Sequence, residues 1–102
     1  MPGQMSFAEF RDSAAAGAAP PAARSPALRA LWHDARGEWD AAHALAQAAG
    51  GADGDWVHAY LHRKEGDAAN AGYWYRRAGK PVSTLPLERE WEAIAGALLI
   101  AA

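Results

Sequence analysis

The chain has no cysteine among its 102 residues, and this absence removes several classes of function at once. A disulfide scaffold, a thiolate metal centre, a catalytic cysteine and a thiol redox role all require that side chain. Long apolar runs are missing too, because charged residues at 88–90 and 92 interrupt the apolar C-terminal part. Since no basic leader followed by an apolar run opens the chain, the sequence predicts a cytoplasmic protein without a membrane segment.

β-branched residues are also scarce, with five in the whole chain: Val57, Val82, Thr84, Ile94 and Ile100. They are too few to furnish the faces of a sheet, so a β fold is excluded. Alanine, the best helix former, occurs 28 times. The composition therefore predicts an all-α protein whose thin core needs closely packed helices.

Charge of one sign is not in large excess, since ten basic and twelve acidic residues give a net charge of −2. No global field favours nucleic acid or an anionic membrane. Between His58 and Lys80, five basic residues stand against two acidic ones, and this stretch includes the three aromatic residues at 73–75. Such a patch suits base stacking and phosphate contacts. Three consecutive aromatics, however, spread around a helix and enter its core, so we do not expect a nucleic-acid partner.

Caps and helix breakers divide the chain into six helical segments. A capping box at Ser6 and Glu9 opens the first segment, and a Gly, Pro and Ala-rich connector follows it. We expect this N-terminal helix to be loosely attached, which divides the chain into residues 1–24 and an α-helical hairpin domain at 25–102. The other helices are predicted at 26–36, 38–49, 56–65, 68–78 and from 83 or 84 onward, with caps at Ser25, at Asp53 or Asp55, and at Asp67.

An internal repeat organises the middle of the chain, because Gly37 and Gly66 are 29 residues apart and each joins two helices. Superimposing the two glycines also places His33 on His62. Small residues where helices cross and glycine at the turn are typical of antiparallel helical hairpins. Two stacked hairpins bury apolar surface that one hairpin leaves exposed. The sequence thus predicts two stacked hairpins closed by a C-terminal helix.

Two stretches of the chain carry a resemblance to known families. Residues 70–79, Asn-Ala-Gly-Tyr-Trp-Tyr-Arg-Arg-Ala-Gly, follow a Gly-Asp pair and resemble the second half of a Sel1-type repeat, a variant of the tetratricopeptide class. Residues 32–43 and 56–63 are similar to a family of short, uncharacterised bacterial helical-hairpin proteins. The resemblance covers about residues 27–98 and implies a helical-hairpin fold, with no activity attached to it.

Histidines are the residues with the clearest site chemistry. His58 and His62 are four residues apart on a helix, and two imidazoles so placed can chelate zinc, nickel or copper. His33 is the predicted third ligand, because it is the repeat equivalent of His62; His43 and Asp34 are further candidates. The zinc-protease pattern His-Glu-x-x-His is absent. The alternative interpretation is that these histidines only pack at the edges of the hairpins.

No catalytic set is recognisable, so a non-enzymatic role is favoured. Serines serve as helix caps, and neither a nucleophile elbow nor a phosphate-binding loop is present. The leading hypothesis is a small helical-repeat-like module that binds a protein partner. Its expected interaction surface consists of Arg63, Tyr73, Arg76 and Arg77.

Three other interpretations stay open at this point. The apolar tail at 97–100 is suited to sealing a homodimer. A histidine-based transition-metal-binding protein or small metalloenzyme, built on His58, His62 and His33, is the alternative function. A pocket lined by some of the five tryptophans is a weaker option. Apart from zinc, nickel or copper, no cofactor is expected.

Overall fold

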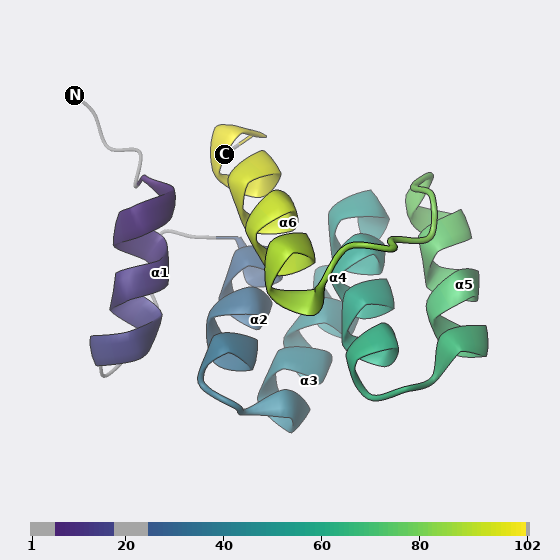
Figure 1. Ribbon diagram of the computed structural model, residues 1–102, viewed down its shortest axis with the longest axis horizontal. Coiled ribbons are helices and arrows are strands. Elements are labelled where there is room, and N and C mark those ends of the chain that lie inside the picture. The colour runs from purple at the N-terminus through teal and green to yellow at the C-terminus, as the bar shows by residue number, and fades with distance from the viewer. Residues whose placement is uncertain (1–5, 18–24, 102) are drawn as a thin grey trace.

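The computed structural model describes residues 6–17 and 25–101, and over these ranges the protein is built of helices without a strand (Figure 1). Its elements are α1 (Phe7–Ala16), α2 (Pro26–Ala35), α3 (Trp39–Ala49), α4 (Gly51–Lys64), α5 (Ala68–Ala78) and α6 (Leu87–Ala101). The predicted all-α class is therefore confirmed. Within the described ranges, no helix is both long enough and apolar enough to cross a bilayer.

Three of the predicted helix starts are confirmed by their caps. The Ser6 hydroxyl accepts a hydrogen bond from the Glu9 amide, and the Ser6 amide donates to the Glu9 carboxylate, which completes the capping box. The Ser25 hydroxyl accepts from the Leu28 amide at the start of α2, with Pro26 in the first turn. The carboxylate of Asp67 accepts from the Asn70 amide at the start of α5.

The predicted start of the fourth helix is wrong. Instead of covering 56–65 with a cap at Asp53 or Asp55, α4 begins at Gly51. Its N-cap is Gly50, which has no side chain to close the helix end. Gly50, with a φ of 61°, ends α3 as expected, and the residues from Gly51 onward form the first turn of α4.

Close packing between α3 and α4 explains this early start. A Cβ atom at Gly54 would lie 2.9 Å from the carbonyl oxygen of Ala46 and 3.1 Å from the Cβ of Ala49. The first distance is too short for a Cβ atom and the second is tight, so the missing side chain allows the first turn of α4 to lie directly against the end of α3. This contact fixes how the two helices meet.

The predicted start of the last helix at Ser83 or Thr84 is also wrong, since α6 begins at Leu87. Proline at 86 disfavours helical backbone at the residue before it, which delays the helix. The hydroxyl of Ser83 instead accepts from the Leu85 amide within the connecting loop.

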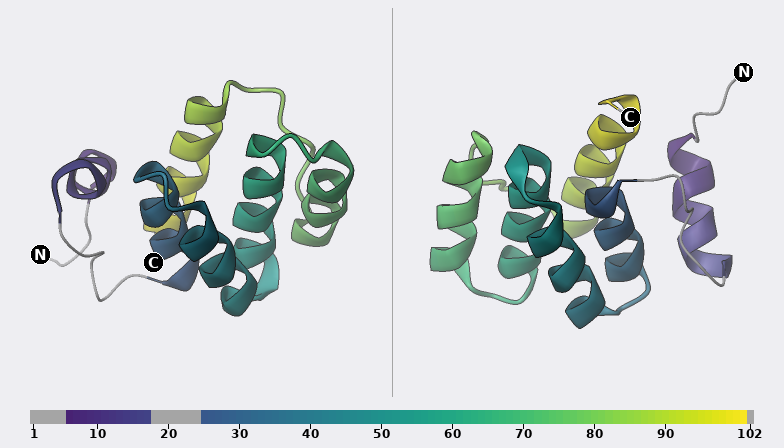
Figure 2. Two further views of the ribbon diagram at one scale, coloured as in Figure 1. Left: turned by 90° about the horizontal axis from the view of Figure 1, so that it is seen from below. Right: turned by 180° about the vertical axis from the view of Figure 1, so that it is seen from behind.

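Helices α2 and α3 pack together, and so do α4 and α5, each pair joined by a short turn (Figures 1 and 2). The glycines of the two turns, Gly37 and Gly66, have φ angles of 78° and 89°. In each turn, the amide of the residue after the glycine donates a hydrogen bond to the carbonyl of a histidine in the last turn of the preceding helix. Glu38 donates to His33, and Asp67 donates to His62. The two turns thus share one hydrogen-bond pattern at equivalent positions.

The main core lies where α2, α4 and α6 meet. Its largest fully buried members are Phe10, Leu28, Leu31, Trp32, Val57, Leu61 and Ile94. A smaller cluster of Ala59, Ala71 and Tyr75 joins α4 to α5. In the C-terminal tail, Leu98 and Leu99 are buried and Ile100 is 83% exposed, so much of this apolar segment belongs to the core of its own chain.

Helix α1, which the sequence predicts to be loosely attached, packs against α2 and α6. Phe10 is fully buried, and its ring stacks on Trp91 with centroids 5.7 Å apart. The indole N–H of Trp32 donates to the Ser13 hydroxyl at 3.0 Å. A buried aromatic contact and a hydrogen bond from α2 thus hold α1 at one end of the row of helices (Figure 1).

Candidate metal centre

Three histidines converge where α3 meets α4. His43 comes from α3, and His58 and His62 lie one turn apart on α4. One ligand nitrogen from each lies within 4.8 Å of the others, and the Nε2 atoms of His43 and His58 are 2.9 Å apart. Nitrogens around a tetrahedral zinc ion are roughly 3.3 Å apart, given Zn–N bonds of about 2.0–2.1 Å. Small side-chain rotations therefore suffice to direct all three nitrogens at one ion.

His33, the predicted third ligand, lies elsewhere. Its Nδ1 is 2.7 Å from Oε1 of Glu38, and its ring edge packs against Trp32. The repeat explains this placement, because equivalent residues of two repeats occupy equivalent turns and are separated by the offset between the repeats. Among the described residues it is His43, a secondary candidate in the sequence, that joins His58 and His62.

The position of His43 follows from the start of α3. Trp39 lies one turn earlier on the same helix face, and its ring stacks on His43 with centroids 4.7 Å apart and an interplanar angle of 14°. The indole N–H of Trp39 donates to the carbonyl of Leu61 at 3.3 Å, which ties α3 to α4. The spacing of Trp39 and His43 was the sequence signal for this ligand.

His58 is the buried member of the cluster, with 4% of its surface exposed. Its ring lies between Trp74 of α5 and His62, at centroid distances of 3.9 and 4.8 Å. Burial, followed by the nearby His43 and His62, lowers the pKa of His58 to about 4. The ring is therefore neutral at physiological pH, which is the form that binds a metal.

His62 is oriented by a carboxylate from its own turn. Its Nδ1 is 2.7 Å from Oε1 of Glu65, so the neutral ring donates its Nδ1 proton there and keeps the lone pair on Nε2. Metal-binding histidines usually have such a carboxylate on the nitrogen that does not face the ion. Asp67 is 4.0 Å from the same nitrogen, but its oxygens accept from the amide and side chain of Asn70.

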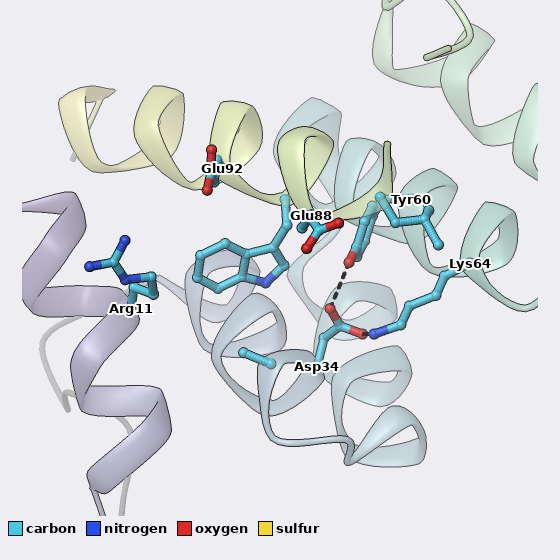
Figure 3. Close-up of a pocket in the computed structure, with 9 residues that line it drawn as sticks. Arg11, Asp34, Tyr60, Lys64, Glu88 and Glu92 are labelled. Atoms are coloured by element: carbon cyan, nitrogen blue, oxygen red, sulfur yellow. Dashed lines mark hydrogen bonds and ion pairs between the residues drawn. The ribbon is translucent and has the colours of Figure 1, made fainter. Parts of the chain in front are cut away.

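A second polar cluster holds Asp34, the other secondary candidate for metal binding (Figure 3). Asp34 is 3% exposed and accepts from the Tyr60 hydroxyl at 2.9 Å, while its second oxygen is 2.9 Å from Nζ of Lys64. Burial and the Asp34 charge raise the pKa of Tyr60, which keeps its hydroxyl protonated as a donor. These residues lie at the edge of a cavity of about 470 Å³, and Asp34 is fully engaged there.

The expected interaction residue Arg63 has a structural role. Its Nη1 is 2.7 Å from Oε1 of the buried Glu90, and its Nη2 donates to the Leu85 carbonyl. Tyr75 also donates to Glu90. Arg63 thus anchors the start of α6 to α4.

The other three expected interaction residues lie together on α5. Tyr73 is 44% exposed, and Arg76 and Arg77 are exposed as well. The guanidinium of Arg77 lies 5.1 Å from the centre of the Trp74 ring, and it donates to the Tyr73 hydroxyl. This face of α5 is therefore polar, aromatic and open.

Comparison of the chain with protein-family models, with curated proteins and with solved structures finds no match. The function must therefore be inferred from the chemistry of the site. Three imidazole nitrogens within 4.8 Å of one another, flanked by two tryptophan rings, form an arrangement that suits a transition-metal cation.

Proposed function

We propose that the protein binds a first-row transition-metal ion, of the class of zinc, nickel or copper, through His43, His58 and His62. The observation that carries this proposal is the convergence of one ligand nitrogen from each histidine within 4.8 Å, across two helices. Imidazole suits these three metals, and three histidines are a sufficient protein ligand set for a zinc or copper ion.

The surroundings of the histidines support this function. His58 is neutral without a metal, so its lone pair is available at physiological pH. Glu65 fixes the tautomer of His62. Stacking on Trp39 and Trp74 limits how far the His43 and His58 rings turn, which lowers the conformational cost of binding.

A bound ion would join the two halves of the molecule. It would link α3, which pairs with α2, to α4, which pairs with α5. As part of the same proposal, these two pairs are repeats of a tetratricopeptide-like or Sel1-like stack, as the shared turn pattern at Gly37 and Gly66 supports. The metal is then a clamp between repeats in a cytoplasmic protein.

The test is to measure metal binding to the metal-free protein by calorimetry and by tryptophan fluorescence. Zinc, nickel and copper are titrated separately, and Trp39 and Trp74 serve as native reporters because their rings lie on the ligands. We expect one ion per chain. Because the ion binds the folded state, a free concentration of 100 times Kd would add about 2.7 kcal/mol of stability, raising Tm by on the order of 10 °C.

Two matched variants decide which histidines bind. His43→Gln should weaken binding by at least about 100-fold, because it removes a ligand whose supporting groups alone are worth 10- to 100-fold. His33→Gln is the control, since His33 is half-buried like His43 but lies outside the cluster, where it pairs with Glu38. Equal affinity in both variants and the wild type would contradict the proposal.

Protein binding is a second candidate, favoured by the open face of α5. Tyr73 and Arg76 are exposed there, and a large aromatic beside arginine is a common composition of binding surfaces. If this face joins a second copy of the chain, sedimentation equilibrium should show a dimer that Tyr73→Ser weakens. A monomer at all concentrations would remove the homodimer, including one sealed by residues 97–100.

A further inference from the structure

We infer that the metal bound at His43, His58 and His62 keeps at least one coordination position for an exchangeable ligand from solvent, a small Lewis base of the class of hydroxide or an inorganic anion. This inference rests on the proposed metal-binding function and adds what the site does with the ion. Closed structural sites have four protein ligands, whereas sites with three protein ligands hold a water or a substrate in the fourth position.

The cluster offers three protein ligands to a metal ion. Within the described part of the chain, the group of potential ligands that contains His43 and His58 has His62 as its only other member. The carboxylates nearest to the cluster have other partners. Glu65 accepts from His62 on the nitrogen that faces away from the ion, and Asp67 accepts from Asn70.

Asp55 is the third carboxylate near the site, and it too is engaged. One of its oxygens is 3.5 Å from Nε of Arg77, and Asp55 acts on His58 only through its charge. Zn²⁺ and Cu²⁺ take at least four ligands when three are imidazoles. The missing donor must therefore come from solvent.

Charge then selects the kind of ligand. All three protein donors are neutral, so a divalent ion keeps its full charge of +2 in a partly buried place beside two tryptophan rings. An uncompensated charge in a medium of low polarity attracts an anion strongly and acidifies a bound water. Hydroxide and small inorganic anions supply both the missing donor and a negative charge in direct contact with the ion, which Glu65 and Asp55 do not provide.

Access and space favour a ligand of only a few atoms. His58 is buried, but His43 is half-buried and the His62 side chain is 13% exposed, so solvent reaches the cluster from their side. The stacked rings of Trp39 and Trp74 limit the room beside His43 and His58. A large organic ligand does not fit this setting as well as a small ion.

The experiment uses the full chain loaded with Cu²⁺ or Co²⁺ and freed of excess metal by gel filtration. Sodium azide, a small anionic probe, is titrated in at constant ionic strength while the absorption and electron paramagnetic resonance spectra are recorded. We expect a saturable change with one azide per ion, including an azide-to-copper charge-transfer band. Loaded protein whose spectra do not respond to azide would overturn the inference and leave metal binding intact, whereas protein that takes up no metal would overturn the proposed function.

Two variants show whether a carboxylate fills the fourth position. Asp55→Asn and Asp67→Asn each remove a carboxylate near the cluster, and asparagine at 67 still caps α5. We expect both loaded variants to respond to azide as the wild type does. A response found in one variant and missing in the wild type would identify that carboxylate as the fourth ligand and overturn the inference.

Discussion

Helix α4 carries two polar clusters that are arranged alike but differ in the side chains that form them. His58 and His62 meet His43 of α3, while Tyr60 and Lys64 meet Asp34 of α2 (Figure 3). In each, two residues one turn apart on α4 receive one side chain from an earlier helix. The two pairs are offset by two positions, about 200° around the helix, so they lie on opposite faces.

The composition of each cluster decides its role. Asp34 accepts from a hydroxyl and an ammonium group, so every charge there has its complement within the protein. The histidine cluster consists of three equal groups with one hydrogen bond among them, between His43 and His58. In a cluster of complementary groups, every polar atom has a partner within the protein. A cluster of three imidazoles instead offers several lone pairs to a cation.

The largest expected effect is the loss of the complementary cluster. Asp34→Ala leaves the buried Tyr60 hydroxyl and the Lys64 ammonium without their partner, which should cost about 3 kcal/mol of unfolding free energy. This loss of unfolding free energy is measured by urea unfolding, monitored by circular dichroism. Zinc affinity of the folded variant should stay within about twofold, because Asp34 is on the other face of α4.

Glu88→Gln is the control for Asp34→Ala, because Glu88 lines the same cavity and is exposed. Its unfolding free energy should change by less than about 0.5 kcal/mol. If Asp34→Ala changed stability as little as this control, the Asp34 cluster would not be a structural element, and the contrast between the two clusters would fail.

Of the two clusters on α4, Gly54→Ala should disturb only the histidine cluster. The new Cβ would meet the Ala46 carbonyl at 2.9 Å and move α3 relative to α4, costing about 2 kcal/mol of stability. Because His43 lies on α3, metal affinity should fall as well. Gly96→Ala is the control, since a Cβ there meets no atom within 4 Å and alanine favours the helix by about 1 kcal/mol. Unchanged metal affinity in Gly54→Ala would show that this contact does not position His43.

The helical class and several helix starts could be predicted from the sequence because their causes are local. Abundant alanine, the capping box at Ser6 and the caps at Ser25 and Asp67 act within one turn of chain. The start of α4 could not be predicted, because glycine breaks an isolated helix and the compensation comes from α3 packing against Gly54. Proline at 86 was a local signal for α6 that the serine and threonine before it obscured.

The histidine site was predictable in part for the same reason. His58 and His62 share a helix, so their spacing alone brings them together. The third ligand depends on which helices are neighbours, and the repeat register identified His33 as equivalent to His62 without making them adjacent. The tertiary contact that brings His43 to the other two histidines is the hydrogen bond from Trp39, on which His43 stacks within α3, to the Leu61 carbonyl of α4.

In the metal-free protein, the histidine cluster should make the unfolding free energy depend on pH below neutrality. The pKa of His58 is about 4 in the folded state, below its usual 6.5, so the unfolded chain binds more protons between these values. Neutral His58 therefore contributes stability that is complete above pH 6.5 and lost as the pH falls toward 4, by about 1.5 kcal/mol between pH 6.5 and 5.

Urea unfolding of the wild type and of His58→Phe at a series of pH values checks this. Phenylalanine keeps a ring against Trp74 but does not titrate, so the variant should lose that part of the pH dependence. The neighbours His43, His62 and Asp55 remain in both proteins, so the difference reports the titration of His58 together with its coupling to these groups. Identical slopes would show that His58 is not held neutral by its surroundings.

The smallest expected effect compares the two repeats directly. Glu65 accepts from His62 and Glu38 accepts from His33, both at 2.7 Å, so the two pairs differ in whether the histidine belongs to the cluster. Glu65→Gln should weaken zinc binding about tenfold, or about 1.4 kcal/mol, because glutamine holds the His62 tautomer less firmly and leaves its ring less basic. Glu38→Gln makes the same change at the equivalent turn and should leave zinc affinity unaltered. Calorimetric titration of both variants measures the difference, and equal affinities would mean that the carboxylates of the two turns serve only the turns themselves.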